Sequence, residues 1–356
     1  MSSKVFFIPA SQNDGQEVLA LKSEKIFKKF GLTPKLDSHS FVALKIHFGE
    51  KGNTGYINPF WLKRIIKQIR NKTSRVFFTD TNTLYAGKRS NAVDHLRLAW
   101  GHGFRQSKLD VPIVIADGLV GRDSGEVKVG LSRIKSAKIA SAFLNSDMLV
   151  CLSHFTGHIL TGFGAAIKNT GMGCASRAGK LEQHSDVHPW VNPKECKECL
   201  LCFEFCPSGA MIQKDGSAFI VKDKCIGCGE CLVVCPSGAV KMHWDEDCGR
   251  IQEKMAEYAY SVFKRFEGNI CFLNYLLKIT KDCDCMSKNG QIIAGDIGIL
   301  GSYDPVALDQ VSVDLVNEKA GKDILRAFHD VDWSVQLRHG AEIGLGTTDY
   351  QLIELK

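Results

Sequence analysis

The chain has 356 residues, of which 44% are hydrophobic and 24% charged, and its formal net charge is +6. This composition is typical of a globular protein with a large core, and it excludes a disordered or low-complexity chain. No segment approaches the roughly 20 apolar residues that span a bilayer, and residues 1–10 lack a secretory signal. We therefore expect a cytoplasmic protein without membrane association.

The positive charge is concentrated in the first third of the chain. Residues 1–110 hold 19 Lys and Arg against 8 Asp and Glu. Solvated helix faces explain such an excess, and attraction of an anionic substrate or an acidic electron-transfer partner would also use it. No nucleic-acid motif accompanies the charge, so nucleic acid is not an expected partner.

The first half of the chain alternates apolar runs with amphipathic stretches. The pattern predicts strands over residues 5–8, 41–47, 75–79, 111–116 and 148–153, and helices over residues 14–30, 59–69 and 91–100. Such alternation is typical of βαβ units around a parallel sheet.

The middle of the chain carries the same cysteine motif twice, 29 residues apart. Each copy reads Cys-x2-Cys-x2-Cys-x3-Cys-Pro, and the copies are Cys196, Cys199, Cys202, Cys206 and Cys225, Cys228, Cys231, Cys235. Three closely spaced thiolates bind one iron-sulfur cube, and the fourth Cys of each run binds the other cube. The spacing therefore predicts two [4Fe-4S] clusters with crossed ligands, one held by Cys196, Cys199, Cys202 and Cys235, the other by Cys225, Cys228, Cys231 and Cys206.

Disulfides or zinc are the alternatives, and neither requires this spacing. Disulfides need no identical quartets, and zinc sites usually use two separated Cys pairs. The repeat resembles the bacterial two-cluster ferredoxin module, and exposed cubes of this kind favour an anaerobic or low-oxygen cell.

The chain returns to α/β character after this repeat. A helix is predicted over residues 247–267, and strands over residues 270–278 and 291–294. We expect one α/β domain, with a mostly parallel sheet flanked by helices, built from residues 1–190 and 246–356. The ferredoxin-like module, residues 191–245, would be inserted into it; three consecutive domains are the alternative.

Ligands of open parallel sheets bind beyond the carboxyl ends of the strands. Polar residues follow the predicted strands at 45–53, 80–83 and 117–121, which suggests a shared crevice, although turns use the same residue types. The run 153–169 adds His158 and Lys168 among small residues. Either could orient or protonate a substrate, and tight packing with a structural His is the alternative reading. Asp309 is a weaker acid-base candidate.

Six cysteines lie outside the repeat, and two of them stand out. Cys283 and Cys285 are one residue apart in a polar segment, and Cys174 lies in a Gly-rich turn. These three could form a third metal or cluster site that a His would complete, and the alternative is structural or redox-active thiols.

The flanks of the cysteine repeat also carry a family resemblance. Residues 161–169, the doubled Cys motif and residues 304–309 together resemble the iron-sulfur proteins catalogued as domain of unknown function number 362. The resemblance implies an α/β scaffold with a ferredoxin module, mostly in anaerobic bacteria and archaea. It implies no reaction.

Three functions fit the sequence. An iron-sulfur oxidoreductase would pass electrons from a redox partner protein, a ferredoxin or reductase, to a small-molecule substrate or metal site on the α/β domain. A non-catalytic electron-transfer subunit would instead dock a partner enzyme. A metal- or cluster-handling protein would use the additional thiols transiently. Size favours the first, because a pure carrier needs only the small module. Flavin and nicotinamide are not expected, since no G-x-G-x-x-G motif joins a strand to a helix.

Overall fold

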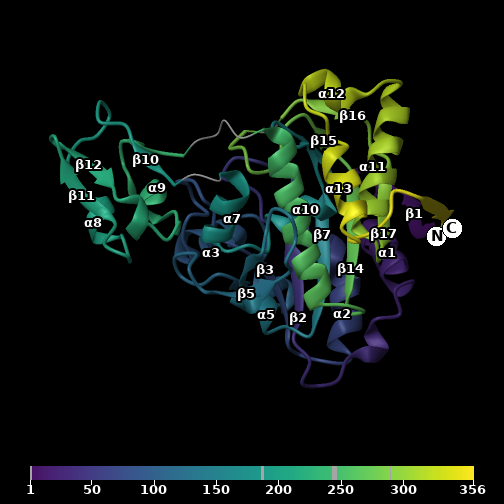
Figure 1. Ribbon diagram of the computed structural model, residues 1–356. Coiled ribbons are helices and arrows are strands. Elements are labelled where there is room, and N and C mark those ends of the chain that lie inside the picture. Colours follow the sequence, from purple (N-terminus) through teal and green to yellow (C-terminus); the bar gives the residue numbers. More distant parts are fainter. Residues whose placement is uncertain (1, 186–187, 243–246, 289) are drawn as a thin grey trace.

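A large mixed α/β domain carries a small Cys-rich unit at one end (Figure 1). The computed structural model describes residues 2–185, 188–242, 247–288 and 290–356. The expected boundary between residues 245 and 246 lies outside these residues. The figure places the unit, residues 190–241, away from both chain ends.

An eight-stranded sheet forms the centre of the large domain (Figure 1). In spatial order its strands are β18 (Tyr350–Glu354), β1 (Ser3–Pro9), β17 (Gly298–Ser302), β14 (Ile270–Leu276), β7 (Met148–His154), β2 (Val42–Ile46), β3 (Val76–Asp80) and β4 (Ile113–Ile115). All neighbours pair in parallel except at β17, which is antiparallel to both β1 and β14. The sheet is therefore mostly parallel, as predicted, and it takes strands from both sides of the Cys-rich unit.

Helices cover both faces of this sheet. One face packs against α1 (Gln16–Lys28), the 3-10 turn η2 (Pro59–Leu62), α2 (Lys63–Arg70) and α3 (Ala92–Gly101). The other face packs against α6 (Ala166–Gly171), α10 (Cys248–Arg265), α11 (Pro305–Ala320) and α13 (Val335–Glu342). Because both faces of the sheet are covered, the central strands consist mostly of apolar residues, and every residue of β14 is buried.

Local sequence signals explain where the longest helices begin and end. The Asp304 carboxylate accepts hydrogen bonds from the amides of Val306 and Ala307, and Pro305 occupies the first turn of α11. Gly321 ends that helix in the left-handed conformation. Asp304 is therefore the N-cap of α11.

Shorter elements complete the large domain. They are η1 (Thr33–Lys35), α4 (Gln106–Leu109), α5 (Ser141–Leu144), α7 (Arg177–His184), α12 (Ile324–Phe328), and the hairpins β5 (Ser124–Lys128) with β6 (Ser136–Ala140), β8 (Thr156–His158) with β9 (Gly162–Gly164), and β15 (Ile279–Thr280) with β16 (Ile292–Ala294). The predicted strand at 291–294 is therefore β16, outside the large sheet.

The Cys-rich unit has its own small core. Its elements are β10 (Trp190–Val191), α8 (Leu201–Glu204), β11 (Met211–Lys214), β12 (Ser217–Ile220), η3 (Lys222–Lys224), α9 (Glu230–Val234) and β13 (Val240–Lys241). Strand β10 pairs with β13, and β11 with β12. Each Cys run begins in a loop and continues into α8 or α9, so the internal sequence repeat is also a structural repeat.

Candidate functional site

A cavity of about 230 Å³ lies at the carboxyl ends of the central parallel strands. Strand β2 and the residues after it contribute Lys45 and His47, the end of β3 contributes Asp80, and β7 ends with His154. The polar residues predicted to share a crevice after β2 and β3 thus line one cavity. Asp117, after β4, is not among the lining residues, but its carboxylate accepts a hydrogen bond from the Asn82 amide at 2.9 Å.

A buried network of charges forms the floor of the cavity. The Lys45 ammonium lies 3.0 Å from the Asp80 carboxylate and donates to Asn169 at 2.6 Å. The Arg89 guanidinium pairs with Glu50 at 3.1 Å and lies 2.8 Å from His47 Nε2. Burial alone would raise the pKa of Asp80, but the Lys45 charge and its neighbours hold that pKa far below its usual value. The Asp80 carboxylate therefore stays ionised.

Lys168 presents to the cavity an amine that has no partner among the described residues. It lies on α6, whose first turn is held by Asp309, because the buried Asp309 carboxylate accepts hydrogen bonds from the Ala166 and Ile167 amides at 2.9 Å. Within the described parts of the chain, Lys168 Nζ makes no hydrogen bond or ion pair. Burial and the Arg89 charge lower its pKa to about 8. Asp309 thus positions α6 and is not itself a cavity residue.

His158, at the end of β8, faces the same cavity. Its Nδ1 lies 2.9 Å from the Thr161 hydroxyl and 3.3 Å from the Leu160 amide. Burial and the Lys168 charge hold its pKa well below 6.5, so the ring is neutral. The two residues predicted as acid-base candidates, His158 and Lys168, therefore line one cavity.

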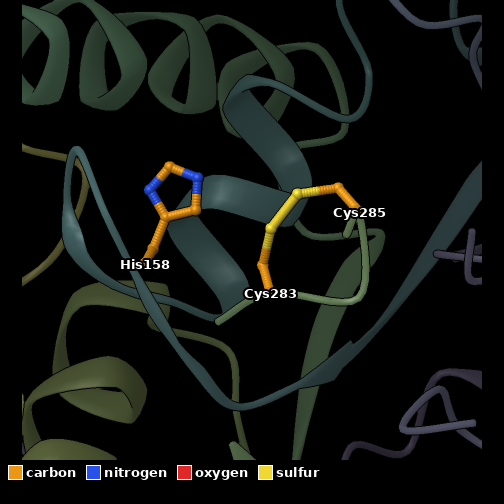
Figure 2. A group of neighbouring side chains, drawn as sticks. All are labelled: His158, Cys283 and Cys285. Carbon is orange, nitrogen blue, oxygen red and sulfur yellow. A yellow bond between two sulfur atoms is a disulfide. The ribbon is translucent and has the colours of Figure 1, made fainter. Parts of the chain in front are cut away.

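Cys283 and Cys285 reach the cavity from the loop after β15, and their sulfurs are joined in a disulfide. Together with His158 they form a group whose nitrogen and sulfur atoms lie within 4.8 Å of one another (Figure 2). Cys174, which sequence reasoning placed with these thiols, belongs to the hydrophobic core, is fully buried, and is not in this group. His158 takes the place expected for Cys174.

The eight repeat cysteines line two separate small cavities of about 20 Å³ each. One is lined by Cys196, Cys199, Cys202 and Cys235, and the other by Cys206, Cys225, Cys228 and Cys231. Each cavity therefore gathers three thiols from one run and the fourth from the other. The Ala210 amide lies 3.3 Å from Cys206 Sγ, a contact that favours a thiolate over a thiol. Four converging sulfurs around one hollow suit a soft-metal cluster.

Two buried charges connect the Cys-rich unit to the large domain. Glu230, on α9, pairs with Arg177 of α7 and lies 3.3 Å from the guanidinium of Arg122. Arg177 also donates to the carbonyls of Thr83 and Ser90. Thr83 also lines the cavity. The loop that holds Thr83 and Ser90 therefore contacts both the cavity and, through Arg177, the Cys-rich unit.

A small apolar cluster lies beside that ion pair. Leu84, Leu181 and Met242 are buried in it, and Leu232 of α9 packs against them. Leu84 also lines the large cavity. The run that begins at Cys225 is therefore the one that contacts the cavity side of the large domain.

Sequence reasoning missed Arg89, Arg177, Lys180 and Glu230. These charged residues are 1–8% exposed, and each is recognisable only from its burial. No motif surrounds them, because their partners are distant in sequence. A charged residue inside an otherwise apolar helical stretch, such as Glu230 before Cys231-Leu-Val-Val, was the one available signal.

The family model described as "Domain of unknown function (DUF362)" matches residues 42–314. No curated protein matches the chain. Among solved structures, the lactate racemase apoprotein from Thermoanaerobacterium thermosaccharolyticum aligns with a TM-score of 0.46 and 13% identity, over 89% of this chain and 57% of that chain. A protein from Thermotoga maritima aligns with a TM-score of 0.43 and 8% identity, over 92% of this chain and 59% of that one.

This chain thus spans less than two thirds of either solved chain. No helix in the described residues is long and apolar enough to cross a membrane.

Proposed function

This chain belongs to the DUF362 family, and we propose that it is an iron-sulfur oxidoreductase that transfers electrons through two [4Fe-4S] clusters to a small anionic substrate in the α/β cavity. The observation that carries the proposal is the gathering of eight cysteines into two quartets, in a unit whose helix α9 packs against Leu84 of the lining of a charged cavity. When bound, such clusters supply single electrons. The chain's own residues must hold them, orient the substrate and exclude water.

The cysteine quartets support crossed ligation. Cys235 lines the hollow of the first run and Cys206 that of the second, which is the arrangement the motif predicts. Backbone amides also approach these sulfurs; the Ala210 amide lies 3.3 Å from Cys206 Sγ. The residues of both hollows therefore fit the clusters.

The contacts of α9 support an order for the two sites. The quartet with Cys225 lies beside Glu230, whose partner Arg177 contacts the cavity loop. Cys199, in the quartet with Cys196, is exposed. All described residues that line this hollow belong to the Cys-rich unit. An external redox partner protein would therefore dock on the side of Cys199, and the quartet with Cys225 would be proximal to the cavity.

The charge of the cavity supports an anionic substrate. Lys45, Arg89 and Lys180 have partners, namely Asp80, Glu50 and the Thr81 hydroxyl. Lys168 has none among the described residues, and its pKa near 8 leaves much of it charged at neutral pH. A carboxylate or similar anion would supply the missing partner, and the ammonium form of Lys168, with its lowered pKa, would also donate a proton to a reduced product.

The first test is iron and acid-labile sulfide content of anaerobically purified protein, with electron paramagnetic resonance after reduction. We expect about eight of each per chain, since each cube holds four irons. The Cys206→Ala variant should lose the cluster of the second run, and Cys235→Ala that of the first. Cys248→Ser, a cysteine outside both hollows, is the matched control and should retain both clusters.

The two variants also test the order of the sites. If the cluster that Cys206 binds is the one nearer the cavity, the Cys206→Ala variant should still accept electrons from a low-potential donor. It should no longer reduce a ligand in the cavity. Loss of the first-run signal in Cys206→Ala would refute crossed ligation. Full cluster content with no anion binding at the cavity would favour the electron-transfer subunit over the enzyme.

A further inference from the structure

We propose that His158, Cys283 and Cys285 bind one soft or borderline divalent metal ion, with an open coordination position facing the central cavity. As the terminal centre of electron transfer this site rests on the proposed function, but metal binding itself is measured independently of the clusters. The three ligand atoms lie within 4.8 Å of one another, and all three residues line the cavity (Figure 2).

The ligand types and their spacing suit such an ion. Tetrahedral zinc has bonds of about 2.0–2.3 Å to nitrogen and sulfur, which places ligand atoms about 3.5 Å apart. A group already within 4.8 Å needs only small side-chain movements to reach that geometry. One imidazole and two thiolates favour zinc, cobalt, nickel or iron over magnesium or calcium.

The loop that presents the two sulfurs is held from several sides. The Asp284 carboxylate, between the two cysteines, accepts from His154 Nδ1 at 2.8 Å, and the Asp284 carbonyl accepts from the Glu50 amide at 2.9 Å. His154 Nε2 donates to the Leu277 carbonyl at 2.7 Å. The pKa of His154 is raised: burial opposes its charge, but the Asp284 carboxylate outweighs burial. The loop is therefore fixed before any metal binds.

The hydrogen bonds of His158 favour its role as a ligand. In the metal-free form Nδ1 of His158 accepts a hydrogen bond from the Leu160 amide at 3.3 Å, so the ring proton lies on Nε2. A metal at Nε2 would move that proton to Nδ1. There the Thr161 hydroxyl, 2.9 Å away, can accept it, because this hydroxyl donates its own proton to the Phe163 carbonyl at 2.7 Å.

Metal binding requires the reduced form of the cysteine pair. The disulfide of Cys283 and Cys285 takes up two electrons and two protons to become two thiols, while a dithiol reductant is oxidised to its own disulfide. Both thiol protons then leave as the metal binds. The two thiolates neutralise a divalent ion, so the loaded site adds no net charge beside Lys168.

Three protein ligands leave a fourth tetrahedral position empty, as in catalytic metal sites. Because His158, Cys283 and Cys285 all line the cavity, this position opens into it. Lys168, which has no hydrogen bond or ion pair to the described residues, lines the same cavity. A small anion with a second oxygen could therefore bind the metal and Lys168 at once.

Cobalt is the probe for this site, because thiolate ligation gives Co²⁺ an intense visible and near-ultraviolet spectrum. The full-length, cluster-loaded protein is reduced with a dithiol, desalted anaerobically and dialysed against Co²⁺ and, separately, Zn²⁺. Alkylation and mass spectrometry confirm that Cys283 and Cys285 are both thiols. We expect one Co²⁺ per chain that is absent from the Cys283→Ser, Cys285→Ser variant.

Single substitutions test the ligand set. His158→Gln should abolish tight binding, and Thr161→Val should weaken it by about 10–100-fold, as loss of an outer-shell partner does. Cys248→Ser and Cys174→Ser are the controls, and both should bind Co²⁺ like the wild type.

The outcomes separate this proposal from the proposed function. Iron content without additional Co²⁺, when both thiols are proven reduced, overturns the metal site and leaves a redox-active thiol pair. The wild-type protein could bind Co²⁺ that the double variant loses and yet hold no iron. That result supports the metal site and refutes the cluster proposal. Equal Co²⁺ in the wild type and the double variant also overturns the metal site.

Discussion

The buried ion pair between Glu230 and Arg177 should dominate the attachment of the Cys-rich unit. Both side chains are nearly inaccessible, at 3% and 1% exposure. Replacing one partner of a buried pair typically costs 3–5 kcal/mol, because the other charge is left buried and unpaired. Glu230→Gln leaves Arg177 with two carbonyl acceptors, on Thr83 and Ser90, so the cost should lie near the lower limit, about 3 kcal/mol.

Arg122 provides the matched comparison. It contacts the same carboxylate at 3.3 Å, yet its side chain is 39% exposed. Exposed ion pairs contribute about 0–1 kcal/mol, so Arg122→Gln should have little effect. Urea unfolding under anaerobic conditions, followed by tryptophan fluorescence and by hydrogen exchange at α9, measures both variants.

The two variants together test the burial argument. If Glu230→Gln changes the free energy of unfolding by no more than Arg122→Gln, burial does not govern this contact and the reasoning fails. Iron content measured in parallel shows whether a change arises from detachment of the unit or from loss of clusters.

Three further predictions concern the large domain. Glu257→Gln should destabilise this domain by about 2–4 kcal/mol. The fully buried Glu257 carboxylate accepts hydrogen bonds from the Ser132 hydroxyl, the Arg133 amide and His339. A loss of less than about 1 kcal/mol in urea unfolding would contradict this. The hydrogen bond to Glu257 raises the pKa of His339, so its stabilisation is complete below pH 6.5 and falls as pH rises through the folded pKa; His339→Gln should abolish that slope. Gly171→Ala should lower the free energy of unfolding by about 1–3 kcal/mol, because a Cβ there would meet the Met255 carbonyl oxygen at 2.2 Å. Gly15 lies in open space, so Gly15→Ala should change the free energy of thermal unfolding by no more than about 0.5 kcal/mol.

Much of the sheet could be predicted because its strands are buried on both faces. The runs at 41–47, 75–79 and 148–153 are mostly apolar, and each forms a strand of the large sheet within about two residues of the prediction. The antiparallel strand β17 was not foreseen, since Gly298-Ile-Leu-Gly-Ser302 is short and Gly-rich. Its two glycines pack closely: a Cβ on Gly301 would meet Ile26 at 2.4 Å. A single sequence does not reveal such close contacts between glycines and neighbouring side chains.

The site was only partly accessible for a different reason. Motif spacing predicts ligands that are neighbours in sequence, so it singled out the two cysteine runs and the pair Cys283 and Cys285, whose role as ligands stays a prediction. His158 and Cys174 were both present as candidates, but only folding brings β8 beside the loop after β15 and leaves Cys174 in the core. Spatial partners 125 residues apart leave no local pattern, which is also why Arg177 and Glu230 escaped notice.

The loop between β3 and α3 ties the cavity to the Cys-rich unit. Tyr85 and Arg89 of this loop line the cavity, while the carbonyls of Thr83 and Ser90 accept hydrogen bonds from Arg177, the partner of Glu230. We expect a ligand that shifts Arg89 to act also on the anchor of the unit. Such coupling is reciprocal, because the factor by which docking of the unit raises ligand affinity is the factor by which the ligand favours docking. The segment 81–90 would thus link occupancy of the cavity to attachment of the Cys-rich unit.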